Sequence, residues 1–262
     1  MKLKLPTKSL IYKLILPSIL AFASSAHSQI VTLLDDTFAS GTNPGYTESA
    51  VGGATISVTT APSGMTDNAL LLSTASNNRG MLRSLNSSVT LAEAGDYIDL
   101  TYNFKFDTTP PNLANSFRSQ FMGSSGAAFA GIGFDFSGLA SNSSVYITDG
   151  TGNLGKIAGI NAGTTVHSFG IRLTMLSDTT AQLTASYDGS ALTSSSTITT
   201  ATSLPNGLTF DQIGLMFVGN PAVGDIYFDN VLVTTNVIPE PGSAMLALFG
   251  AAFLGYRRLR RA

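Results

Sequence analysis

Side chains that could carry out catalysis are scarce in the long central part of this sequence. Between Gln29 and Ile238 the only glutamates are Glu48 and Glu93, and His167 is the only histidine. Hydrolysis of a glycosidic bond needs two carboxylates flanking that bond, and lyases and triad hydrolases need a histidine base. Because the carboxylates show no such pairing and the histidine stands alone, we interpret this region as non-catalytic.

The sequence of one glycine-rich stretch is similar to the motifs of nucleotide-binding loops. Gly150 to Lys156 reads Gly-Thr-Gly-Asn-Leu-Gly-Lys, and Ile157 follows. A phosphate-binding loop requires Ser or Thr after the lysine to hold magnesium, so we interpret the stretch as a turn and loop between strands. Oxygen-bearing side chains alternate here as in a calcium loop, without the further acids that such a loop uses; they are Asp149, Thr151 and Asn153.

The elements that must position these side chains are β-strands. From Ile98 to Phe106 apolar and polar residues alternate, which is the period of a strand with one buried face. The Asp188-Gly189 pair predicts a type I′ hairpin with a return strand from Ala191. Further strands are expected at Phe169–Met175, Gln182–Tyr187, Ile226–Thr234, Val31–Leu34, Ile56–Thr59, Ala69–Leu72, Gly131–Phe136 and Ser144–Thr148. The fold class predicted is all-β, an antiparallel β-sandwich of the jelly-roll kind.

Charge separates the central part from the two ends. Gln29 to Ile238 carries six basic and fifteen acidic residues, a net charge of −9, whereas the whole chain has −2. So acidic a surface repels nucleic acid, which we exclude as a partner. The chain has no cysteine, so disulfides and thiol chemistry are excluded as well.

The N-terminal segment has the layout of a secretory signal peptide. Four lysines precede a short apolar run, and small residues then stand at Ala26 and Ser28. Small residues at these positions suit signal peptidase, so we expect mature protein to begin at Gln29, with cleavage after Ala26 as the alternative.

The C-terminal segment combines three features. Pro239, Glu240 and Pro241 precede an uncharged apolar run from Gly242 to Tyr256. That run is shorter than the ~20 residues that span a bilayer, but flanking arginines can extend it by snorkelling. These are Arg257, Arg258, Arg260 and Arg261. They predict one hydrophobic helix with its C-terminus in the cytoplasm; a permanent anchor or a buried core helix is the alternative.

This C-terminal layout resembles the sorting signal of PEP-CTERM proteins. The resemblance covers 237–262 and rests on the order of the three parts. It implies an exosortase-type processing enzyme as partner, cleavage near the Pro-Glu-Pro motif, and brief attachment to the inner membrane of a Gram-negative bacterium through the helix. It also implies release or transfer to the cell surface or extracellular matrix, in bacteria that make exopolysaccharide.

A second resemblance concerns the region between the two ends. Leu34–Phe38, Tyr187–Gly189 and Ile226–Val231 are similar to short motifs of concanavalin-A-like and carbohydrate-binding-module jelly rolls. Glycosidases of that kind carry a Glu-x-Asp-x-Glu strand, which is absent here. The resemblance also implies a structural calcium ion between the chain ends. Asp36, with Asp35 as the alternative, and Asp229 are the candidate ligands; no other cofactor is expected.

Aromatic platforms for sugars are limited to tyrosine, because the chain has no tryptophan. We expect exposed rings at Tyr46, Tyr97, Tyr146 and Tyr227, and core positions for Tyr102 and Tyr187. The sequence thus predicts a signal peptide (1–28), a β-sandwich domain (29–236) and a sorting segment (237–262). The function expected is a non-enzymatic structural or adhesive role at the surface, linked to exopolysaccharide. The alternative is a carbohydrate-binding module for the cell's own exopolysaccharide.

Overall fold

The computed structural model describes residues 29–49, 53–74, 79–107, 116–123, 131–137, 143–148, 153–160, 164–192, 196–199, 208–218 and 224–237. Every regular element within these ranges is a β-strand. None of the described residues belongs to a helix that is long and apolar enough to cross a membrane. The predicted signal peptide and C-terminal helix lie outside the described residues.

The strands form two sheets in which all neighbours are antiparallel. The nine-stranded sheet contains β1 (Val31–Asp36), β3 (Ala54–Thr60), β4 (Asn68–Thr74), β6 (Tyr97–Phe106), β11 (His167–Ser177), β12 (Thr180–Tyr187), β13 (Ser190–Ala191), β14 (Ser196–Thr199) and β16 (Gly224–Thr235). The seven-stranded sheet contains β2 (Thr47–Glu48), β5 (Arg79–Thr90), β7 (Ser116–Met122), β8 (Ile132–Ser137), β9 (Ser143–Thr148), β10 (Asn153–Ile160) and β15 (Thr209–Val218).

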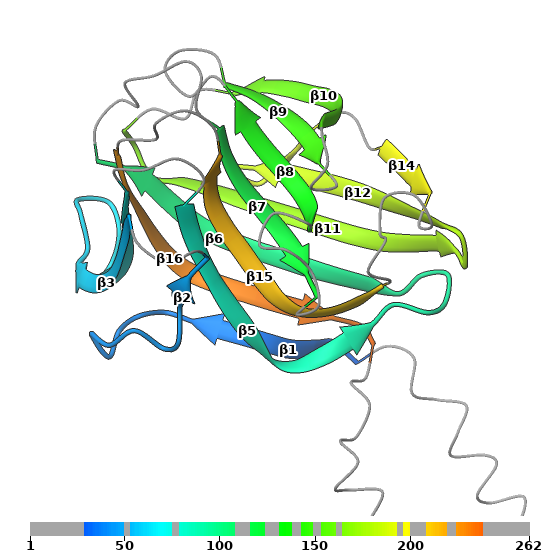
Figure 1. Ribbon diagram of the computed structural model, residues 1–262, viewed down its shortest axis with the longest axis horizontal. Coiled ribbons are helices and arrows are strands. Elements are labelled where there is room, and N and C mark those ends of the chain that lie inside the picture. The colour runs from blue at the N-terminus through cyan, green and yellow to red at the C-terminus, as the bar shows by residue number, and fades with distance from the viewer. Residues whose placement is uncertain are drawn as a thin grey trace, which may run out of the picture.

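The strand order places chain segments that are far apart in sequence side by side. The nine-stranded sheet runs β13-β12-β11-β6-β16-β4-β3, and β1 pairs with the C-terminal half of β16. The seven-stranded sheet runs β10-β9-β8-β7-β15-β5-β2. Figure 1 shows β5, β15, β7 and β8 in one layer and β16, β6, β11 and β12 in the other. The predicted all-β antiparallel sandwich is therefore confirmed.

The core lies between the two sheets and follows from the alternation along the strands. On β6 the apolar residues of the alternating pattern, among them Tyr102 and Phe104, are at most 3% exposed. Phe228 of β16 lies beside Tyr102, with ring centroids 5.7 Å apart, and also contacts Phe117 of the other sheet at 5.5 Å. The Tyr102 hydroxyl shares a hydrogen bond with the Ser119 hydroxyl across the sandwich. Each such ring contributes about 1.5–3 kcal/mol through burial of apolar surface.

One predicted loop is in part a strand. Asn153–Ile160, in the glycine-rich stretch interpreted as a turn and loop, forms β10 and pairs with β9. The β9–β10 register shifts twice, next to Gly155 and next to Ala158. Such irregularities interrupt the two-residue period, so the alternation that marks other strands is absent from this sequence.

Candidate functional site

A pocket lies on the outer face of the nine-stranded sheet. Its volume is about 490 Å³. One row of its lining crosses five neighbouring strands, since Asp35 on β1 pairs with Leu232 on β16, which pairs with Thr101 on β6. Thr101 in turn pairs with Gly170 on β11, and Gly170 pairs with Ser186 on β12. The pocket is therefore extended across the strands, and the residues of this row belong to the outward-facing half of each strand, with Leu232 as their apolar member.

The floor of the pocket depends on Gly170. A Cβ atom at this position would meet the Ser186 Oγ at 2.7 Å and the Thr101 Cγ2 at 3.3 Å. The hollow thus exists because one strand carries no side chain where its two neighbours do. A larger residue would fill it, and the Ser186 side chain would have to turn away.

A second row of the lining includes Asn230, which sits in a β-bulge. Asn230 has a φ of 53°, and the register between β16 and β6 shifts next to it. The carboxylate of Asp229, itself 2% exposed, accepts hydrogen bonds from the Asn230 N–H (2.8 Å) and Nδ2 (3.1 Å). The Thr66 hydroxyl donates to the same carboxylate at 3.4 Å. Burial raises the pKa of Asp229, against the opposite effect of these hydrogen bonds.

One end of the pocket adjoins a line of three hydrogen-bonded side chains, Thr165, His167 and Asp188, which we call the file. Ser168 and Gly189, which line the pocket, flank His167 and Asp188 in the sequence. The His167 Nδ1 lies 2.8 Å from the Asp188 Oδ2, and its Nε2 lies 2.9 Å from the Thr165 hydroxyl. A hydroxyl, an imidazole and a carboxylate in this order are the groups of a nucleophile, a base and an orienting acid.

The imidazole in this file is held in place. The His167 ring stacks on Tyr187, with centroids 4.9 Å apart and 27° between the planes. The second Asp188 oxygen accepts the Ser168 N–H at 2.9 Å. Burial, followed by the charge of Asp188, raises the pKa of Tyr187. The same contacts join the start of β11, where His167 lies, to the β12–β13 hairpin.

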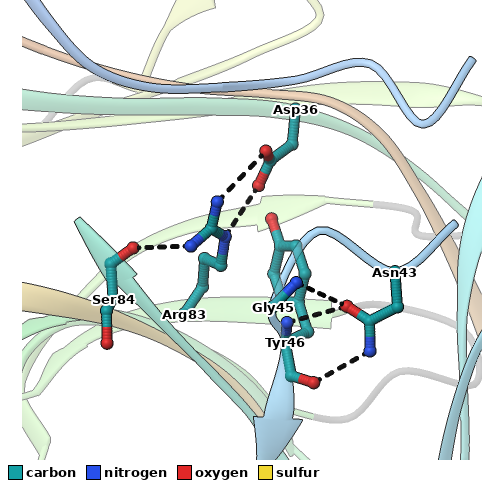
Figure 2. A network of polar contacts seen from close by, with 6 residues as sticks. All are labelled: Asp36, Asn43, Gly45, Tyr46, Arg83 and Ser84. Atoms are coloured by element: carbon teal, nitrogen blue, oxygen red, sulfur yellow. Dashed lines mark hydrogen bonds and ion pairs between the residues drawn. The ribbon is translucent and has the colours of Figure 1, made fainter. Parts of the chain in front are cut away.

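Asp36, one of the two predicted calcium ligands, lies in an ion pair inside the sandwich. Its Oδ2 accepts from the Nε of Arg83 at 3.1 Å (Figure 2), and the two side chains are 7% and 15% exposed. Asp36 belongs to β1 and Arg83 to β5, so the pair joins the two sheets. Arg83 also donates to the Ser84 carbonyl at 3.0 Å and lies 5.8 Å from the centre of the Tyr46 ring.

The structure gives Asp36 and Asp229 different partners. Asp36 forms an ion pair with Arg83, whereas Asp229 accepts hydrogen bonds from Asn230 and Thr66. Within the described part of the chain no three His, Cys, Asp or Glu residues form a group that could hold a metal ion. The calcium site stays a prediction, and Asp149 and Thr151 of the other candidate lie outside the described residues.

The tyrosine predictions are partly wrong. Tyr46, expected to be exposed, is 4% exposed, because a loop held by Asn43 turns its ring onto Phe38 at 5.9 Å. Figure 2 shows its hydroxyl directed toward Asp36 and Arg83. Tyr97 and Tyr227 are half-buried, and Tyr102 is in the core as predicted. Tyr187, predicted as a core residue, is only half-buried because it lies beside the rim residue His167. Tyr146 is outside the residues whose side chains are described.

Sequence reasoning missed most of the pocket. The sequence assigns no role to Thr101, Gly170 or Ser186. Asn230 falls within a motif of the jelly-roll resemblance, and Asp35 is a candidate only as a metal ligand. The signal available in the sequence is the outward-facing half of each alternating strand. It shows which residues of one strand share a face, but it does not show which strands are neighbours. The predicted processing residues lie outside the described residues: Ala26, Ser28, Pro239, Glu240, Pro241, Arg257, Arg258, Arg260 and Arg261.

Comparison with known protein families confirms the resemblance of the C-terminal segment. Residues 237–261 match the PEP-CTERM protein-sorting motif. No curated protein matches the chain.

Solved structures share the fold of the described region. A carbohydrate esterase from the Shiga toxin-encoding bacteriophage phi24B is 14% identical, with a TM-score of 0.52 over 80% of this chain and 100% of that one. The cellulose-induced protein Cip1 is 13% identical, with a TM-score of 0.50 over 76% of this chain and 96% of that one. Peanut lectin is also similar, at 13% identity and a TM-score of 0.49 over 79% of this chain and 97% of that one. The first two likenesses extend to the sandwich architecture, as the second sequence resemblance implied.

Proposed function

We propose that this chain is an exported surface protein, sorted by an exosortase-type enzyme, whose β-sandwich binds a neutral polysaccharide across the outer face of its larger sheet. The match of residues 237–261 to the sorting motif supports the route to the surface. The observation that carries the binding function is the polar pocket extended over five strands. In this proposal the adhesive role expected from the sequence is performed by the pocket.

The lining matches the chemistry of a sugar. Hydroxyl groups of a glycan both donate and accept hydrogen bonds, and the lining supplies hydroxyls from Thr101 and Ser186, amides from Asn103 and Asn230, and the Asp35 carboxylate. Leu232 adds an apolar contact for the C–H face of a ring. Among the residues that the structure describes, the lining contains a carboxylate and no cation, which disfavours polyuronates and other anionic polymers.

The shape favours a chain of sugars over a single sugar. Strands in a sheet are spaced about 4.8 Å apart, so the row from β1 to β12 is about 19 Å long. A ligand of that length lies perpendicular to the strands and contacts Asp35 at one end and Ser186 at the other. Such a site suits an adhesive protein, because several weak contacts along one polymer add up.

Glycan binding by purified Gln29–Val237 tests the proposal. Soluble glucan and mannan are compared with polyuronates of similar length on an array and by calorimetry. We expect binding to at least one neutral polymer, and loss of about tenfold or more in affinity for Gly170→Val, since the added side chain occupies the floor. Thr174→Val, on the same face of β11 but outside the pocket lining, serves as the matched control. Binding that is unchanged in Gly170→Val would refute the pocket as the site.

The sorting route is tested by the mass of the protein recovered from the surface or medium of its native host. We expect loss of the residues after about Pro241, and retention of the tail when Pro239, Glu240 and Pro241 are replaced by Ala. An intact chain ending at Ala262 in the membrane fraction would contradict the route and favour a permanent anchor.

A second candidate function, ester hydrolysis, is favoured by the file Thr165–His167–Asp188. The Thr165 oxygen would attack the carbonyl of an O-acyl sugar while His167 takes its proton, and the sugar hydroxyl would leave with that proton. Water would then hydrolyse the acyl-threonine. The test is release of acetate from an O-acetylated polysaccharide, with loss of release in Thr165→Val and His167→Gln. No release by the wild-type protein would exclude this candidate and leave the file as a restraint on the hairpin.

A further inference from the structure

The C-terminal end of β16 is tied to the rest of the sandwich as far as the last described residue. The Asn236 side chain accepts the Tyr97 N–H at 2.8 Å and donates to the Gly95 carbonyl at 2.9 Å. The Thr235 hydroxyl donates to the Tyr97 carbonyl at 2.6 Å and accepts the Val237 N–H at 3.1 Å. The Val237 side chain packs against the core. We call these contacts of Thr235, Asn236 and Val237 the Asn236 clasp.

The clasp is held on a rigid support. The turn that receives it, between β5 and β6, is joined to β11 by the Gly95 N–H, which donates to the Met175 carbonyl at 2.8 Å. The Met175 N–H donates back to the Asp96 carbonyl at 2.8 Å. Within the turn, the Asp96 carboxylate accepts the N–H groups of Ala92 (2.9 Å) and Glu93 (2.8 Å). The end of β16 is therefore fastened to a folded surface that does not depend on the C-terminal segment.

The clasp lies directly beside the sorting motif in the chain. Only Ile238 separates Val237 from Pro239. Two residues of extended chain reach at most about 7 Å, so the fold ends within that distance of the motif. A processing enzyme that must surround the chain near Pro239 meets the body of the sandwich on the N-terminal side of the motif.

We propose that the Asn236 clasp restrains processing, and that the enzyme acts on the state in which the end of β16 has detached from the β5–β6 turn. Enzymes that cut chains next to folded structure act on transiently opened forms, at a rate that follows the population of those forms. The inference rests on the proposed sorting route. It adds that the folded domain itself sets the rate of release, so that the protein stays at the membrane for a time determined by the clasp.

Pulse-chase labelling of the full chain in its native host tests the inference, with conversion of precursor to processed protein as the readout. In Asn236→Ala two hydrogen bonds of the clasp are lost, and we expect processing to be about 5- to 30-fold faster. A second variant inserts six Gly/Ser residues between Val237 and Ile238, which leaves the clasp intact and adds about 20 Å of chain. It should be processed faster as well, because the enzyme then reaches the motif without opening the fold.

A matched control is available in Asn43→Ala. Asn43 also ties down a loop with its side chain, accepting the Tyr46 N–H at 2.7 Å and donating to the Tyr46 carbonyl at 2.9 Å, but it lies beyond the opposite end of β1. Its replacement should leave the processing rate unchanged. Equal rates for the wild-type chain, Asn236→Ala and the insertion variant would overturn the inference, as would slower processing of either variant. Absence of any processing in the wild-type chain would instead overturn the sorting route itself.

Discussion

Two clusters built from the same three residue types, Asp, Arg and Tyr, occupy opposite environments in this protein. In the inner cluster, Asp36, Arg83 and Tyr46 lie between the sheets, where the two charged side chains are 7% and 15% exposed. In the outer cluster, Arg172 on β11 binds both oxygens of Asp99 on β6 and lies 4.2 Å from the centre of the Tyr97 ring, on the solvent side of one sheet. There the guanidinium is 48% and the carboxylate 19% exposed.

The two clusters separate contact geometry from burial, the two factors that could decide how much an ion pair stabilises the fold. The outer pair has the better geometry, because Arg172 Nε lies 2.7 Å from Asp99 while Arg83 Nε lies 3.1 Å from Asp36. If one partner of the outer pair is removed, water can solvate the remaining charge. If one partner of the inner pair is removed, the remaining charge is buried and cannot be solvated. The inner cluster should therefore control stability, and the outer one should hardly affect it.

The largest effect is expected from Arg83→Met. Removal of the guanidinium leaves the Asp36 carboxylate buried and unpaired, which should lower the free energy of unfolding by about 3–5 kcal/mol. Urea unfolding of Gln29–Val237, followed by circular dichroism, measures the change. A loss below about 1 kcal/mol would place the inner cluster in the same class as the outer one.

Replacing both inner charges sharpens the contrast. In the double variant Asp36→Leu with Arg83→Met neither charge of this pair remains, so most of the stability lost in Arg83→Met should return, about 2–4 kcal/mol. The same urea experiment measures it. If the double variant were as unstable as the single one, packing around Arg83 rather than the unpaired charge would account for the loss.

The third prediction concerns high pH. Burial, followed by the charge of Asp36, raises the pKa of Tyr46. A raised folded-state pKa means that the unfolded chain loses this proton first. The resulting stability is complete below the unfolded value near 10 and is lost as pH rises, by at most about 1.4 kcal/mol per pH unit. Unfolding free energies between pH 9 and 11 should fall less steeply in Tyr46→Phe than in the wild-type protein. If the free energy of unfolding fell equally steeply with pH in both proteins, Tyr46 would not be a source of the stability lost at high pH.

The smallest effect is expected from Arg172→Met in the outer cluster. The hydrogen bond that Arg172 donates to Asp99 raises the pKa of Arg172, but the Arg172 side chain is 48% exposed to water. We expect a loss of about 0–1 kcal/mol, which should shrink further between 0.1 M and 1 M salt because exposed charges are screened. A loss above 2 kcal/mol that is insensitive to salt would remove the distinction between the two clusters.

How far the sequence predicts the fold depends on which strands are considered. The strands β6, β11 and β12 alternate clearly, because one side of each faces the core and the other faces water. β7 and β15 escaped prediction because neither sequence alternates between polar and apolar residues. On β15 the consecutive residues Leu215 and Met216 are both apolar and at most 1% exposed. On β7 polar residues stand on both sides, since Ser119 contacts Tyr102 in the core and the next residue, Gln120, is also buried. Neither strand therefore shows the period of two.

The candidate site was harder to predict from the sequence than the fold. The pocket is a row of residues from five strands, and only the registers between those strands bring Asp35, Thr101 and Gly170 into one line. The inner ion pair likewise joins residues 47 positions apart and in different sheets. Alternation within one strand carries no information about its neighbours. By contrast, the sorting motif is contiguous in the chain and was readable directly.

The position of β16 in its sheet determines how the protein bears mechanical load. This strand pairs with β6 on one side, and with β4 and then β1 on the other. Under the proposed function, a pull on Val237 against a polymer bound over Leu232 would be directed along β16. It would shear many interstrand hydrogen bonds at once instead of peeling them apart one by one. A protein that is tethered at its C-terminal end and grips a strand of matrix on its outer face would thus take the tension through the most extensively paired strand of its sheet.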